Sequence, residues 1–159
     1  MKGNPEVIGH LQEVLKAELT AISQYVLHSE MMDNWGYKGL AKYTKMEAIG
    51  EMKHAEAVIE RLLFLDGTPS MQDLNKLRIG QNVQQMHEND LALEFDAVDR
   101  LNKASASAVA AGDNGSRELF ESILKDEEGH VDFLEAQLTM IEQMGLPNYL
   151  MTQVEKENA

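Results

Sequence analysis

The chain has 159 residues, a length that fits one domain, so we expect residues 1–159 to fold as a single unit. It contains no cysteine, which excludes disulfide scaffolds, thiolate metal sites and cysteine nucleophiles. The formal net charge of −13 argues against a nucleic-acid partner, and no apolar run approaches the ~20 residues of a membrane span. The first residues lack the apolar run of a signal peptide, so we expect a cytoplasmic protein.

The first half of the chain predicts two long helices joined by a short turn. Residues 5–34 carry apolar side chains at helical spacing, with Pro5 in the first turn, where its missing N–H costs nothing. The dipeptide Trp35-Gly36 interrupts this pattern. A second helix is expected over residues 37–65 and should stop at the turn signal Asp66-Gly67-Thr68-Pro69.

The second half repeats this arrangement after a long connection. Residues 70–82 have no clear helical pattern and are expected to form a crossover. Helices are expected over residues 83–111 and 116–144, followed by a short fifth helix over residues 147–154. Two short joins and one long middle join predict an all-α four-helix bundle with one long crossover and a short C-terminal fifth helix.

A carboxylate occupies the apolar face of each long helix near its middle. On the second and fourth helices this carboxylate begins a Glu-x-x-His motif, and every candidate in the second helix pair lies 76 positions after its counterpart in the first. One such motif is weak evidence because short patterns recur by chance, whereas the whole set at one offset is a strong signal. The candidate catalytic and metal-binding residues are Glu18, Glu51, His54, Glu94, Glu127 and His130.

The chemistry of these side chains explains why they belong together. Four carboxylates in one core would repel one another and take up protons, but two divalent cations would offset their four negative charges. Positions i and i+3 share a helix face, so both residues of a Glu-x-x-His motif can reach the same metal pair. Oxygen and imidazole ligands without thiolate suit iron or manganese. The pattern therefore predicts a di-metal centre inside the bundle.

Six segments spread over nearly the whole chain carry a resemblance to a known family. They are MKGNPEVI at 1–8, ELTAISQY at 18–25, EMKHA at 51–55, RLLFLDG at 61–67, DEEGH at 126–130 and MGLPNY at 144–149. With these segments the chain resembles the bacterioferritins, haem-containing members of the ferritin-like di-iron proteins. The resemblance implies a ferritin-like fold and a role in iron storage and detoxification.

The resemblance also implies the reaction, a ferroxidase reaction that oxidises Fe(II) to Fe(III) with O2 or H2O2 at two iron ions per subunit. Glu18 and His54 would then bind one iron, Glu94 and His130 would bind the other, and Glu51 and Glu127 would bridge them. The ferric product would be deposited as mineral inside a hollow homo-oligomeric cage of 24 subunits built from twofold dimers. A ferredoxin-type reductase is compatible with this family as a redox partner.

A second implied cofactor is haem b, shared between two subunits through one methionine from each. Met52 matches the family's axial ligand. It follows Glu51 by one residue, about 100° around the helix, and therefore points away from the expected metal core. Ile49, Ile59 and Leu63 continue its apolar stripe, which needs a second partner such as a twofold-related subunit. The same stripe would also suit a dimer without haem.

Two positions depart from the family pattern. Some bacterioferritins carry a His and an Asp on the inner face of the second helix as an extra iron site, where this chain has Met46 and Gly50. Glu47 alone would be a poor site, so we expect no ordered iron there. Tyr25 lies one heptad after Glu18, where the family keeps a tyrosine beside the metals, and an ordinary core tyrosine explains it equally well.

Two other functions remain open from the sequence. One is a haem-binding electron-transfer protein whose di-iron site is mainly structural. The other is a di-iron or di-manganese peroxidase without storage. The second apolar stripe and the fifth helix favour an assembled iron store over a small standalone enzyme.

Overall fold

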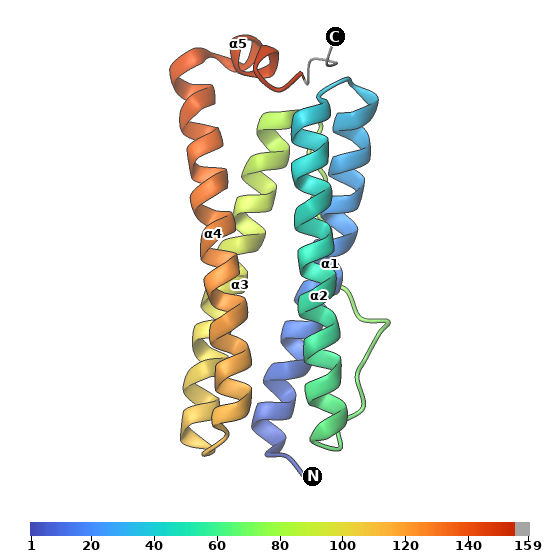
Figure 1. The fold of residues 1–159 in the computed structure, drawn as a ribbon, viewed down its shortest axis with the longest axis vertical. Helices are drawn as coiled ribbons and strands as arrows, with labels where there is room; N and C mark the ends of the chain where they lie inside the picture. The colour runs from blue at the N-terminus through green and yellow to red at the C-terminus, as the bar shows by residue number, and fades with distance from the viewer. Residues whose placement is uncertain (155–159) are drawn as a thin grey trace.

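Five helices account for most of residues 1–154, which the computed structural model describes (Figure 1). They are α1 (Pro5–Asn34), α2 (Lys38–Phe64), α3 (Val83–Ala110), α4 (Asn114–Met144) and α5 (Leu146–Met151). The pairs α1–α2 and α3–α4 are antiparallel, the crossover of residues 65–82 runs back along the bundle, and α5 lies across one end. The predicted four-helix bundle with one long crossover and a short fifth helix is confirmed. None of these helices is long and apolar enough to cross a membrane.

Two helix ends differ from the sequence-based expectation by more than one residue. α4 begins two residues early because Asp113 caps it, its side chain accepting a hydrogen bond from the Ser116 N–H at 3.0 Å. The fifth helix was expected over residues 147–154 but ends at Met151. There the Thr152 hydroxyl donates a hydrogen bond to the Tyr149 carbonyl at 2.7 Å. This carbonyl lies in the last turn of the helix, where it has no partner within the helix.

The two larger of three apolar clusters lie at opposite ends of the bundle. One joins the start of α1 to the end of α2 and includes Val7, Leu11, Leu62, Phe120 and Ile123. The other joins the end of α1 to α5 and includes Met32, Leu40, Met86, Ile141 and Tyr149. Between the two clusters, every long helix contributes a buried glutamate. Packing at both ends therefore fixes the helices around a polar middle layer.

The crossover has no regular secondary structure, yet α1 holds its backbone at four levels. The anchoring side chains stand at positions 12, 20, 24 and 28, which lie along one face of the helix. The contacts are Gln12 Nε2 to the Thr68 carbonyl at 2.6 Å, Ser70 N–H to Gln12 Oε1 at 3.1 Å, Asn75 N–H to Thr20 Oγ1 at 2.9 Å, Arg78 N–H to Gln24 Oε1 at 3.0 Å, and Gly80 N–H to His28 Nε2 at 3.0 Å. These bonds satisfy backbone groups that have no ladder or helix partner.

The loss of the Gln24 anchor should be felt strongly, because its side chain is fully buried and also donates to the Asp90 carboxylate at 2.7 Å. In Gln24→Leu, both the Arg78 N–H and Asp90 lose a partner at a cost of about 1–3 kcal/mol. We expect trypsin to cleave after Lys76 and Arg78 at least about tenfold faster than in the unaltered protein, because the crossover opens more often.

The matched control is Gln72→Leu, which makes the same replacement at an exposed crossover residue. Its cleavage rate should stay close to that of the unaltered protein. Equal cleavage of both variants would show that the anchors on α1 do not hold the crossover.

Candidate metal centre

The six candidate ligands meet at mid-bundle, and each long helix supplies at least one of them. The four glutamates are almost completely buried, with exposed fractions of 4% or less for Glu18, Glu51, Glu94 and Glu127. The two histidine side chains are slightly more open, at 12% for His54 and 16% for His130. Carboxylates are rarely this buried unless they are paired or bind a metal.

The ligand atoms fall into two overlapping groups of four. Within each group the atoms lie within 4.8 Å of one another, and Glu51 and Glu127 belong to both. The first group is Glu18, Glu51, His54 and Glu127, and the second is Glu51, Glu94, Glu127 and His130. The arrangement therefore offers two adjacent groups, each with the donor atoms to hold a cation, that share two carboxylates.

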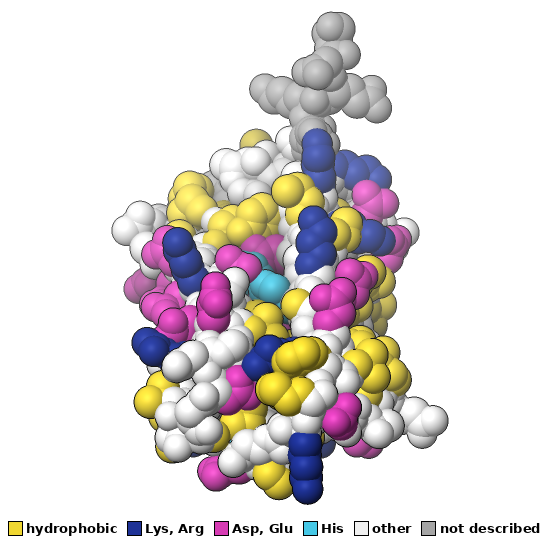
Figure 2. All heavy atoms as spheres, turned by 60° about the horizontal axis from the view of Figure 1, so that its bottom comes forward, with side chains coloured by type: hydrophobic (Ala, Val, Ile, Leu, Met, Phe, Trp, Pro, Cys, Tyr) yellow, Lys and Arg dark blue, Asp and Glu magenta, His cyan; other side chains and the backbone are white. Residues whose placement is uncertain are grey.

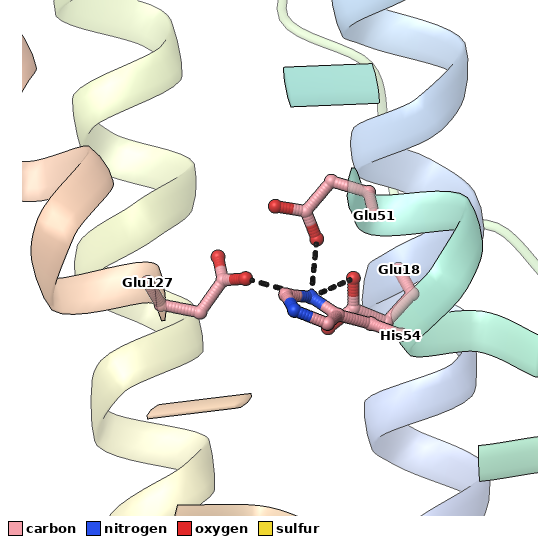
Figure 3. A group of neighbouring side chains, drawn as sticks. All are labelled: Glu18, Glu51, His54 and Glu127. Atoms are coloured by element: carbon pink, nitrogen blue, oxygen red, sulfur yellow. Dashed lines mark ion pairs between the residues drawn. The ribbon is translucent and has the colours of Figure 1, made fainter. Parts of the chain in front are cut away.

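Each imidazole turns its Nδ1 atom toward the carboxylates. The His54 Nδ1 lies 3.2 Å from Glu127, 3.5 Å from Glu51 and 3.6 Å from Glu18 (Figure 3). The His130 Nδ1 lies 3.2 Å from both Glu51 and Glu94 and 3.7 Å from Glu127.

Several of these atoms are buried without a hydrogen-bond partner. They are Glu18 Oε2, Glu51 Oε1, His54 Nδ1, Glu94 Oε2 and Glu127 Oε1. A buried oxygen or nitrogen with no partner costs free energy, and a cation placed among these atoms would supply the missing interaction. The donor set contains carboxylate oxygens and imidazole nitrogens only, which fits iron or manganese.

Two further carboxylates hold the outer nitrogens of the imidazoles. The His54 Nε2 lies 2.8 Å from Asp126 Oδ2, and the His130 Nε2 lies 2.8 Å from Glu47 Oε2. Such contacts fix the ring orientation and direct the other nitrogen toward a metal. The sequence does not reveal these roles of Glu47 and Asp126, because both contacts cross between α2 and α4 and leave no spacing signal within one helix.

Tyr25 lies beside the candidate ligands, on the same face of α1 as Glu18, which precedes it by one heptad. Its buried hydroxyl donates a hydrogen bond to Glu94 Oε1. Burial and the nearby Glu94 charge raise the pKa of Tyr25 well above its usual value. The hydroxyl is therefore protonated at neutral pH and available as a donor.

The carboxylates and imidazoles perturb one another strongly. Burial, followed by repulsion from Glu51, raises the pKa of Glu18, and burial with the neighbouring Glu94 raises that of Glu127. Burial also opposes ionisation of Glu51, but its close contacts with Glu18 and the two imidazoles outweigh burial and lower its pKa. Burial opposes the charge on His54 and His130, yet their contacts with carboxylates raise both pKa values above the usual range. The metal-free cluster therefore retains protons.

A groove between α2 and α4 leads to the two histidines. It has a volume of about 460 Å³, and His54, His130, Glu47 and Asp126 are among the residues that line it. On the face drawn in Figure 2, histidine atoms are visible between groups of acidic side chains. Acidic walls attract cations, so this groove is a suitable entry for metal ions.

Met52 lies outside this cluster. Its side chain is 46% exposed on α2, and Ile49 and Leu63 are also exposed, whereas Ile59 packs partly against the core. Met46 is exposed as well, and open space surrounds Gly50. The outward stripe expected from the sequence is therefore present on α2, and Glu47 contacts His130 instead of joining an inner pair of ligands.

Because the metal-free cluster retains protons, the stability of the metal-free protein should depend on pH. The pKa of Glu127 is higher in the folded protein than its ordinary value of 4.5. Its protonated carboxyl group therefore adds to the free energy of unfolding in full below pH 4.5, and this contribution is lost as pH rises toward the folded-state pKa. The raised pKa values of His54 and His130 also make the free energy of unfolding fall as pH rises above 6.5. The lowered pKa of Glu51 has the opposite effect, because it makes the protein less stable as pH falls. We expect the free energy of unfolding of the metal-free protein to fall between pH 5 and pH 8.

Measuring unfolding against pH for Glu127→Gln distinguishes titration of this buried cluster from titration of surface groups. Glutamine cannot ionise, so the denaturant midpoint of the variant should change less with pH over this interval. A variant whose midpoint follows the unaltered protein at every pH would exclude Glu127 as a source of the dependence.

Comparison with known proteins agrees with the fold. The ferritin-like domain family matches residues 8–144. A bacterioferritin of Mycolicibacterium paratuberculosis is 48% identical over 149 residues, covering 94% of each chain. A bacterioferritin of Streptomyces coelicolor is 47% identical over 156 residues, covering 98% of this chain and 93% of the relative, and one of Brucella melitensis is 44% identical over 149 residues, covering 94% and 92%.

These matches extend over nearly the whole chain and include all four helices that supply the candidate ligands. The protein belongs to the bacterioferritin family of ferritin-like domain proteins.

Proposed function

We propose that this protein stores and detoxifies iron by oxidising Fe(II) to Fe(III) at the mid-bundle centre and depositing ferric mineral inside a hollow cage. The observation that carries the proposal is the pair of overlapping four-residue groups, with buried oxygens that have no hydrogen-bond partner. Relatives of this length and similarity are named bacterioferritins. The cage is a homo-oligomer of 24 subunits built from twofold dimers.

Each ligand has a defined role in this proposal. Glu18 and His54 bind one ferrous ion, Glu94 and His130 bind the other, and Glu51 and Glu127 bridge the pair. The two groups share the two bridging residues, which supports this division. Two divalent ions offset the four carboxylate charges, so substrate binding displaces the protons that the metal-free cluster retains.

The reaction removes one electron from each of two ferrous ions. Those two electrons reduce O2 to H2O2 with two protons, or reduce H2O2 to two water molecules with two protons. The protein holds the ions at adjacent positions, and Glu47 and Asp126 keep the imidazoles oriented through contacts of 2.8 Å each. Tyr25 fixes one oxygen of Glu94 by its hydrogen bond.

Haem b is the second component of the proposal, with Met52 of each of two subunits as an axial ligand. The thioether suits this role because it is nearly half exposed on the apolar stripe of α2 rather than packed in the core. Bound haem would supply a path for electrons that reduce stored iron, and a ferredoxin-type reductase is a suitable donor. A function in haem electron transfer alone would not explain why four carboxylates are buried together at mid-bundle.

The double variant Glu94→Gln/Glu127→Ala tests the oxidation site. It removes one terminal ligand and one bridge, so ferrous oxidation, measured by the rise of ferric absorbance after mixing with aerobic buffer, should slow by at least about 100-fold. The helices should persist, because removing two buried carboxylates relieves repulsion in the metal-free protein.

The control is Glu128→Gln/Glu135→Ala, which alters two other glutamates of α4 that lie outside both ligand groups. It makes the same change in charge and should oxidise ferrous iron at close to the original rate. Rapid oxidation by the Glu94/Glu127 variant would refute the site assignment, and a small particle on native size measurement would refute the cage.

Met52→Leu tests haem binding separately. Leucine keeps the volume and the apolar character while removing the sulfur, so packing should change little. The variant should assemble and oxidise ferrous iron while its haem absorbance is lost. Met71→Leu, at another exposed methionine, is the control and should keep its haem. An unaltered haem spectrum in Met52→Leu would rule this residue out as the ligand.

A further inference from the structure

A second cavity lies between α1 and α3, against the crossover, and shares no lining residue with the groove between α2 and α4. It has a volume of about 300 Å³, is open to solvent on one side, and is lined by α1, α3 and residues of the crossover, whose course is visible in Figure 1. The residues that line it are Ala17, Thr20, Gln24, Asn75, Lys76, Arg78, Leu93, Asp96 and Arg100. None of them belongs to the two groups of candidate metal ligands.

The charge of this cavity is opposite to that of the chain. Three cationic side chains, Lys76, Arg78 and Arg100, meet there with a single carboxylate, although the whole chain has a net charge of −13. Arg78 lies 3.9 Å from Asp96, a loose contact because both side chains are more than half exposed. Within residues 1–154, neither Lys76 nor Arg100 forms an ion pair. Three cations beside one carboxylate repel one another and attract an anion.

The crossover presents these cations from a fixed backbone. The Asn75 N–H is held by Thr20 Oγ1 at 2.9 Å and the Arg78 N–H by Gln24 Oε1 at 3.0 Å. Lys76 therefore lies between two anchored levels, and Arg100 approaches from α3, a rigid helix. Because the backbone is already held, only the side chains have to become ordered when a ligand binds.

We propose that this cavity is a binding site for a phosphate-type oxyanion. Two guanidinium groups offer planar pairs of N–H donors that match the oxygens of a phosphoryl group, and Lys76 adds a third positive charge. The volume exceeds that of one phosphate ion, which leaves room for hydration water or for the rest of a phosphate ester. Inorganic phosphate and a phosphate monoester share the chemistry that this site recognises.

Calorimetric titration of the assembled, iron-free protein with sodium phosphate at constant ionic strength tests the proposal. Iron-free protein is required because ferric iron itself binds phosphate, and it keeps this test independent of the proposed iron chemistry. We expect saturable binding of one phosphate per chain, and at least tenfold weaker binding by Arg78→Gln/Arg100→Gln. Circular dichroism and native size should match the unaltered protein. If the double variant fails to assemble, Arg100→Gln alone should still weaken binding.

The matched control is Lys103→Gln/Arg117→Gln, which removes two exposed cations outside the cavity. It should bind phosphate as the unaltered protein does. A second titration uses adenosine monophosphate. If it binds at least tenfold tighter than phosphate, and Arg78→Gln/Arg100→Gln loses this binding, the ligand is a phosphate ester. If it binds no tighter than phosphate, the ligand is inorganic phosphate. No saturable binding of either ligand, or equal weakening in the control variant, would overturn the proposal.

Discussion

The repulsion between four glutamates at one level of the bundle is the constraint on which the rest of the structure depends. Their side chains are buried, so water cannot screen their charges, and the raised pKa values of Glu18 and Glu127 express the cost of ionising them together. Apolar clusters above and below keep the helices from moving apart to relieve this repulsion. Only protons or cations remain to offset it, and the two imidazoles supply part of the positive charge.

The uneven packing of the four helices creates the access to this layer. α1 packs extensively on α2, and α3 on α4, while α2 and α4 touch at few places. The two histidines lie along that sparse seam, beside the groove. The crossover, by contrast, closes the outer side of α1 through side chains spaced along one helix face. One side of the bundle thus gives ions access to the histidines, and on another side hydrogen bonds hold the crossover against α1.

Periodicity in the sequence predicted the helices and the ligand set, because both depend on spacing within a helix. Glu51 and His54 share a face by their separation alone, and the outward direction of Met52 follows from its one-residue offset. The contacts of Asp126 and Glu47 with the imidazoles could not be predicted, since they depend on how α2 and α4 are placed relative to each other. The crossover anchors were also missed, because an irregular segment has no period to detect.

The two outer carboxylates give the halves of the centre different sensitivities to dissolved salt. Asp126, which contacts His54, is 59% exposed, whereas Glu47, which contacts His130, is 12% exposed. Mobile ions screen an exposed pair far more than a shielded one. Rising ionic strength therefore loosens the support of His54 while leaving that of His130 nearly intact, so two halves with equivalent ligands respond unequally to the same solution.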